Sequence, residues 1–140
     1  MRPIRSAIAG VGNCASALLQ GLDYYGKRRS SPKESEGIPG LLHPRIGPYT
    51  PADIQIVAAF DIDARKVGHP LEVALTAAPN CTTQFVKRLP RYGVKVQMGP
   101  VLDGVAPHMK NYPTSQTFII AKAPSADVAR IERELDSVQR

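Results

Sequence analysis

The chain has 140 residues and a mass of 15.1 kDa, with 43% hydrophobic and 21% charged residues. This length suffices for one domain with a buried core, and the composition excludes a collagen-like chain, a coiled coil and a low-complexity disordered chain. No apolar run reaches the ~18 residues of a transmembrane helix, so we expect no membrane partner. Two cysteines cannot form a disulfide framework, which favours a reducing, cytoplasmic compartment.

The net charge of +6 is compatible with a nucleic acid, a membrane surface or a phosphorylated small molecule as partner. The positive residues form two small clusters, Lys27–Arg29 and Lys87–Arg88 with Arg91. Both are shorter than a persuasive basic patch, and the chain has no Trp and few other aromatic residues for base stacking. We interpret the clusters as solvated loop charge and expect no nucleic-acid partner.

Strand-like and helix-like segments alternate along the chain. Residues 4–9 predict a strand rather than a signal peptide, because Gly10 and Gly12 interrupt the apolar run. In chain order there follow a helix at 15–25, a long loop at 26–50, a strand at 54–60, a short helix at 71–77, a strand at 94–98, an irregular stretch with an apolar segment at 117–121, and a helix at 127–138 capped by Ser125. This order predicts an α/β fold: the first half of a Rossmann-like, doubly wound parallel sheet.

A glycine motif, Gly10-x-Gly12-x-x-Ala15, lies between the first strand and the first helix. Gly10 permits a tight turn, Gly12 lets the backbone approach a pyrophosphate, and Ala15 allows close packing of helix and strand. The helix N-terminus adds N–H groups and a partial positive charge. The motif therefore predicts dinucleotide binding, the alternative being a purely structural turn.

Asp61 follows the second strand, where an acidic side chain typically binds the adenosine ribose. It lies 49 residues after Gly12 rather than the usual ~20, and the loop at 26–50 accounts for the excess. A carboxylate at this position favours NAD over NADP. Arg65 and Lys66 are nearby cations that could accept a 2′-phosphate instead, and a solvated acidic loop is the structural alternative.

The remaining reactive residue types indicate no catalytic centre. Cys14 and Cys81 do not form a C-x-x-C motif, and we interpret both as small packing residues. The three histidines, His43, His69 and His108, lie in loops without partners at ligand spacing, so no metal site is predicted.

Several longer blocks resemble myo-inositol-1-phosphate synthase (inositol-3-phosphate synthase) of the bacterial and archaeal type. The similarity begins with Val11-Gly12-Asn13-Cys14-Ala15-Ser16 and extends over about residues 4–104. Further blocks are Gln20-Gly21-Leu22-x-Tyr24-Tyr25, Pro39-Gly40-Leu41-x-His43, Gly47-Pro48-Tyr49, Val57 to Gly68, Ala78-Pro79-Asn80 and Gly99-Pro100-x-Leu102-Asp103-Gly104.

The resemblance implies an isomerase that converts D-glucose 6-phosphate to 1L-myo-inositol 1-phosphate, as in inositol and phospholipid biosynthesis. In that family a tightly bound NAD is reduced and then regenerated within one turnover. Carried over by position, the pyrophosphate would lie at Gly10, Gly12, Asn13 and Cys14, the ribose at Asp61 and Ile62, and the rest of the nucleotide pocket at Asn80 and Thr82.

The family's catalytic lysines, sugar-phosphate pocket and tetramer-forming domain would lie beyond residue 140. We therefore expect residues 1–140 to be the NAD-binding segment, with a crossover loop at 26–52, no catalytic residue, no catalysis by this chain alone, and a homo-oligomer once the remainder is supplied. Two other interpretations stay open: a nucleotide-binding or interaction module without catalysis, and the first half of another NAD(P) dehydrogenase. Departures from the family include Asn80-Cys81 in place of two asparagines and the pair His69-Pro70.

Overall fold

The computed structural model describes residues 2–27 and 38–138, so Arg28, Arg29 and residues 30–37 of the predicted loop lie outside the described residues. Three strands are present there, β1 (Ile4–Ala9), β2 (Ile54–Asp61) and β3 (Val96–Met98). The α-helices are α1 (Asn13–Lys27), α2 (Leu71–Ala74) and α3 (Val128–Val138), and two short 3₁₀ helices are η3 (Pro51–Asp53) and η4 (Pro107–Asn111).

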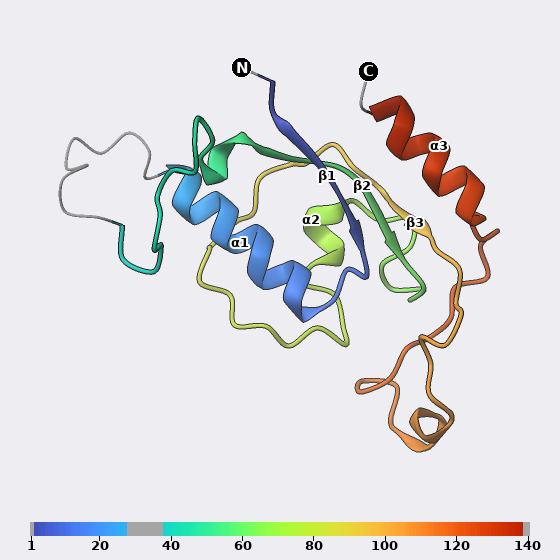
Figure 1. Cartoon of the computed structure of the whole chain (residues 1–140). Helices are drawn as coiled ribbons and strands as arrows, with labels where there is room; N and C mark the ends of the chain where they lie inside the picture. The colour runs from blue at the N-terminus through green and yellow to red at the C-terminus, as the bar shows by residue number, and fades with distance from the viewer. Residues whose placement is uncertain (1, 28–37, 139–140) are drawn as a thin grey trace.

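The strands form one parallel sheet in the order β1-β2-β3. Ile4 pairs with Ile54 at the start of β1, and a bulge between Ser6 and Ala7 shifts the register by one residue. Helices α1 and α2 lie on one side of the strands and α3 on the other (Figure 1). The predicted α/β class and Rossmann-like half-sheet are therefore confirmed.

The core lies between the sheet and the α1–α2 layer. β2 is apolar along nearly its whole length, and its last four residues are all buried, as expected for the central strand of a covered parallel sheet. Leu19 from α1 and Leu71 and Leu75 around α2 are fully buried against it. This packing fixes where β1 and β2 end, and so positions the loops that follow them.

Several element boundaries differ from the predictions. β3 begins at Val96 rather than 94, because Val94 and Lys95 pair with Leu71 and Pro70 and pairing with β2 starts at Val96. α2 spans only Leu71–Ala74. Residues 117–121 form no strand; Ile120 makes a single bridge to Asp63.

The predicted cap of the last helix was wrong. The Ser125 hydroxyl donates to the Ala126 carbonyl, whereas Asp127 Oδ1 accepts the Arg130 N–H at 2.6 Å. Asp127 directly precedes α3 and is therefore its N-cap. None of the helices in the described part of the chain is long and apolar enough to span a membrane.

Candidate functional site

A turn containing Gly10 and Gly12 joins β1 to α1 at the carboxyl end of the sheet (Figure 1). Gly10 has a φ of 88°, and its N–H donates to the Phe60 carbonyl at 2.8 Å, which ties the turn to β2. Gly12 is different: its φ is not left-handed, and a Cβ there would meet no described atom within 4 Å. The backbone conformation thus favours glycine at 10, while nothing in the described chain requires it at 12.

Asp61 lies beneath this turn and is only 7% exposed. Its Oδ2 accepts the Val11 N–H at 2.7 Å, and its Oδ1 accepts the N–H groups of Ile62 and Asp63 at 2.8 and 2.9 Å. A carboxylate can accept about four hydrogen bonds, and backbone N–H groups of the chain supply three of them. Asp61 therefore fixes the glycine turn to the end of β2.

Lys66 supports the same turn from inside the protein. Its side chain is fully buried, and Nζ donates to the Val11 carbonyl at 2.8 Å and to Asn80 Oδ1 at 2.9 Å, with Asp61 Oδ2 at 3.8 Å. The Asn80 amide donates to the same Val11 carbonyl at 3.0 Å. Burial lowers the pKa of Lys66 and outweighs the opposite effect of the neighbouring carboxylates. Both backbone polar groups of Val11 are thus hydrogen-bonded: Asp61 accepts from its N–H, and Lys66 and Asn80 donate to its carbonyl.

The first turn of α1 is joined to the segment after α2 by an exposed polar cluster. Asn13 Oδ1 accepts the Cys81 N–H at 2.8 Å and the Thr82 hydroxyl at 2.9 Å, and the Asn13 amide lies 3.5 Å from Cys81 Sγ. Cys14 and Cys81 are both free and exposed, so their interpretation as packing residues was wrong.

Arg65 does not offer its charge to a ligand at this edge. Its guanidinium forms a two-pronged ion pair with the fully buried Asp63 at 2.8 and 2.5 Å and donates to the carbonyls of Thr114 and Thr117. Burial alone would raise the pKa of Asp63, but hydrogen bonds from Arg65 and the Ile119 N–H hold that pKa below its usual value. Through these contacts the ion pair attaches the segment at 99–127 to the residues that follow β2. The hydrogen bonds and charge of Asp63 also raise the pKa of Arg65.

Gln20, which the sequence did not mark as important, anchors the long segment between α2 and β3. Its side chain is 1% exposed; Nε2 donates to the Thr83 carbonyl at 3.2 Å, and Oε1 accepts the N–H groups of Phe85 and Val86. In the sequence, Gln20 stands out only as part of the block Gln20-Gly21-Leu22, and no local pattern indicates its burial or its contacts with residues 83–86.

The structure thus brings the predicted cofactor residues to one edge of the sheet. Gly10, Gly12, Asn13 and Cys14 form the turn and helix start, Asn80 and Thr82 contact it directly, and Asp61 supports it from below. Ile62 is half-buried one residue beyond Asp61. No group of three or more His, Cys, Asp or Glu residues that could hold a metal ion occurs at 2–27 or 38–138.

Comparison with known proteins places these residues in context. Inositol-3-phosphate synthase of Corynebacterium glutamicum is 50% identical over 107 residues, which cover 76% of this chain and 28% of that enzyme. The synthase of Mycolicibacterium smegmatis is 42% identical over 133 residues, 95% of this chain and 34% of that enzyme. The chain is homologous to part of inositol-3-phosphate synthase. This confirms the resemblance, and a share of about a third is consistent with the expected N-terminal part.

A solved structure is similar to this inositol-3-phosphate synthase homologue in both fold and sequence. The crystal structure of Ari2 superposes with a TM-score of 0.65 at 40% sequence identity, over 71% of this chain and 30% of that chain. No protein-family model matches the chain. The chain spans about a third of the length of the curated relatives that it matches.

Proposed function

We propose that residues 1–140 form the NAD-binding segment of an inositol-phosphate synthase and that the glycine turn holds the pyrophosphate of the cofactor. The observation that carries the proposal is the glycine turn between β1 and α1 at the carboxyl end of the sheet, where Gly12 leaves open space next to the backbone. The described residues do not account for glycine at this position, and the open space would let a pyrophosphate approach the backbone closely. The first turn of α1 adds N–H groups that favour an anion.

The rigidity of the turn supports this role. Asp61, Lys66 and Asn80 together fix both polar groups of the Val11 peptide, so the turn is preorganised before a ligand binds. The ribose contact of Asp61 stays a prediction; its remaining acceptor position is compatible with one hydroxyl.

The surroundings of Asp61 favour NAD over NADP. The two nearby cations are both committed to the protein, Lys66 in the interior and Arg65 on Asp63. A 2′-phosphate would therefore meet the Asp61 carboxylate without a free cation from either residue.

For the whole enzyme we propose the reaction implied by the homologous synthases, the conversion of D-glucose 6-phosphate to 1L-myo-inositol 1-phosphate. NAD supplies a transient oxidation and reduction in that chemistry. The described residues would bind and orient the cofactor, while enolisation and ring closure need preorganised groups around the sugar phosphate that we do not assign to this segment. The cytoplasmic location and the homo-oligomer stay predictions.

Calorimetric titration with NAD tests the proposal on matched variants. Gly12→Ala places a methyl group in the open space and should weaken NAD binding roughly tenfold or more, about 1.4 kcal/mol, without lowering thermal stability. Gly21→Ala is the control, because Gly21 lies within α1 and its added Cβ also meets no described atom. It should raise helix stability by up to ~1 kcal/mol and leave NAD affinity unchanged.

The proposal is overturned if the chain binds no NAD, or if Gly12→Ala and Gly21→Ala bind it as well as the parent. A parallel assay with glucose 6-phosphate measures inositol phosphate formation. NAD binding without turnover fits a cofactor-binding segment, whereas turnover by this chain alone would show that the segment contains catalytic groups.

A further inference from the structure

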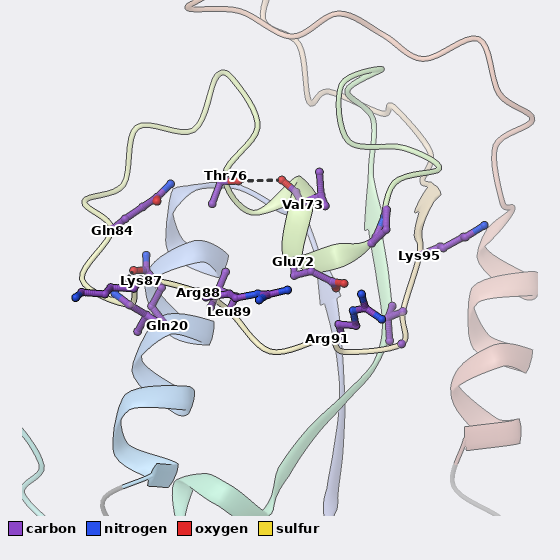
Figure 2. A pocket seen from close by; sticks show the side chains of 14 residues that line it. Gln20, Glu72, Val73, Thr76, Gln84, Lys87, Arg88, Leu89, Arg91 and Lys95 are labelled. Atoms are coloured by element: carbon purple, nitrogen blue, oxygen red, sulfur yellow. Dashed lines mark hydrogen bonds between the residues drawn. The ribbon is translucent and has the colours of Figure 1, made fainter.

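A pocket of about 660 Å³ opens between α2 and the segment at 84–95 (Figure 2). Its size lies within the ~300–1,000 Å³ range of small-molecule sites. It includes none of the eight residues predicted to bind the cofactor. The pocket is thus separate from the glycine turn, although Gln20 of α1 contributes to its wall.

Positive charge dominates the lining. Lys87, Arg88, Arg91 and Lys95 line the pocket, against a single carboxylate, Glu72. Figure 2 shows Arg88 and Arg91 directed toward the Glu72 side chain, while Lys87 and Lys95 point outward. The cluster that the sequence suggested to be loop charge therefore surrounds one concavity, and Lys95 joins it from the approach to β3.

Glu72 does not form a direct ion pair with Arg88 or Arg91. Among residues 2–27 and 38–138, no ion pair within 4.0 Å joins Glu72 to either arginine; its Oε2 instead accepts the Tyr92 N–H at 3.5 Å. Two guanidinium groups next to one carboxylate leave an excess of positive charge at the centre of the pocket. An anion with two acceptor oxygens matches the paired donors of a guanidinium.

The wall that carries these cations is anchored to the fold. Gln20 holds the backbone of Phe85 and Val86, and the Leu71 N–H donates to the Val94 carbonyl at 2.9 Å. Leu89 and Val94 pack against the core. The positions of Arg88 and Arg91 are therefore set by packing on both sides of them, which favours a preformed site.

We propose that this pocket binds a small organic phosphate ester, with the phosphate at Arg88 and Arg91 and the organic part against the apolar lining of Leu89 and Val94. A monoester phosphate carries nearly two negative charges at neutral pH, which suits the excess of cations. No aromatic side chain lines the pocket, so the stacking surface that single-stranded nucleic acids use is missing. A small ligand therefore fits the enclosure better than a nucleic acid.

The test is a saturation-transfer NMR titration of the 140-residue chain with phenyl phosphate at constant ionic strength. Phenyl phosphate contains no nucleotide and so does not report on the glycine turn. The parent chain should bind it saturably at one site. Arg88→Gln with Arg91→Gln should weaken binding roughly tenfold or more, since both charge-assisted donors to the phosphate are removed. Glu72→Gln should strengthen binding severalfold by removing the opposing charge.

Two controls separate the pocket from general charge. Lys110→Gln with Lys122→Gln removes the same charge outside the pocket and should leave the affinity unchanged. A saturating concentration of NAD should not displace phenyl phosphate. The proposal is overturned if binding is not saturable, if both double variants weaken it equally, if Glu72→Gln has no effect, or if an oligonucleotide at equal phosphate concentration binds more tightly than phenyl phosphate.

Discussion

At the scale of single residues, the half-buried Tyr92 stands apart because of its hydroxyl group. Its hydroxyl is enclosed and has no hydrogen-bond partner within the described residues. Burial, followed by the charges of Asp23 and Glu72, raises its pKa to about 12. A buried polar group without a partner destabilises the fold by ~1–3 kcal/mol relative to a paired one.

Tyr92→Phe should therefore stabilise the chain. At pH 7 we expect a gain of up to ~1 kcal/mol in the free energy of unfolding, because the unpaired hydroxyl is removed while the ring stays. Since the folded pKa of about 12 exceeds the unfolded value of 10, wild-type stability is lost as the pH rises from 10 toward 12, and the phenylalanine variant lacks this loss. Urea unfolding at pH 7 and pH 11 measures both effects.

The exposed Tyr112 provides the matched control. Tyr112→Phe should change neither the stability at pH 7 nor its fall above pH 10. A loss of more than 1 kcal/mol in Tyr92→Phe would show that the Tyr92 hydroxyl has a hydrogen-bond partner and would contradict the prediction.

Single residues also show which site features a sequence can predict. The glycine turn and Asp61 are recognisable because local spacing places them at the ends of adjacent parallel strands. The inward direction of Lys66 is not recognisable in this way. Its partners, the Val11 carbonyl and Asn80, lie 55 and 14 residues away in sequence, so only the tertiary fold turns this cation from a candidate phosphate contact into a support of the turn.

At the scale of elements, the start of α3 depends on one side chain. Asp127 Oδ1 accepts the Arg130 N–H at 2.6 Å, a shorter contact than the 3.1 Å from the same N–H to the Asp127 carbonyl, and a carboxylate there also interacts favourably with the helix dipole. Ser125 lies two residues earlier and makes no such contact; its hydroxyl donates to the neighbouring Ala126 carbonyl.

Asp127→Ala should consequently destabilise α3 by about 0.5–2 kcal/mol. Amide hydrogen exchange of the α3 backbone should become roughly threefold to thirtyfold faster, following that free energy. Ser125→Ala is the control and should leave exchange in α3 unchanged. If the serine variant accelerates exchange as much as the aspartate variant, Asp127 is not the cap.

Element boundaries show a similar division between local and tertiary causes. β1 was predicted to the residue and β2 to within one residue, because each is a mainly apolar segment that ends at a local signal, Gly10 after β1 and Asp61 in β2. β3 is shorter than its apolar pattern: Val94 packs on the core but outside the strand, since its carbonyl accepts the Leu71 N–H and pairing with β2 starts at Val96. An apolar pattern marks burial, and pairing with β2 decides where the strand begins.

At the scale of the whole molecule, β1 forms an unpaired edge of the described sheet. β1 pairs with β2 on one edge, and within the described chain no strand lies on its other edge. Ile8 is buried under the α1–α2 layer, but Ala7 and Ala9 on the opposite face are exposed, and Ile4 is 40% exposed. α3 lies on that side of the sheet but near β3 (Figure 1). An unpaired edge with small and apolar side chains is a template for pairing with another chain.

We therefore expect the 140-residue chain to self-associate, and Ala7→Lys to reduce this association. A lysine on an edge strand blocks pairing with a second copy because its charge must stay hydrated, while the exposed position should leave thermal stability within ~0.5 kcal/mol. Ala17→Lys on the exposed face of α1 adds the same charge away from the sheet and serves as the control. Sedimentation velocity over a range of concentrations should show Ala7→Lys shifted toward the monomer and Ala17→Lys unchanged. A monodisperse monomeric parent would refute self-association, and an equal shift in both variants would assign the effect to net charge rather than to the edge of β1.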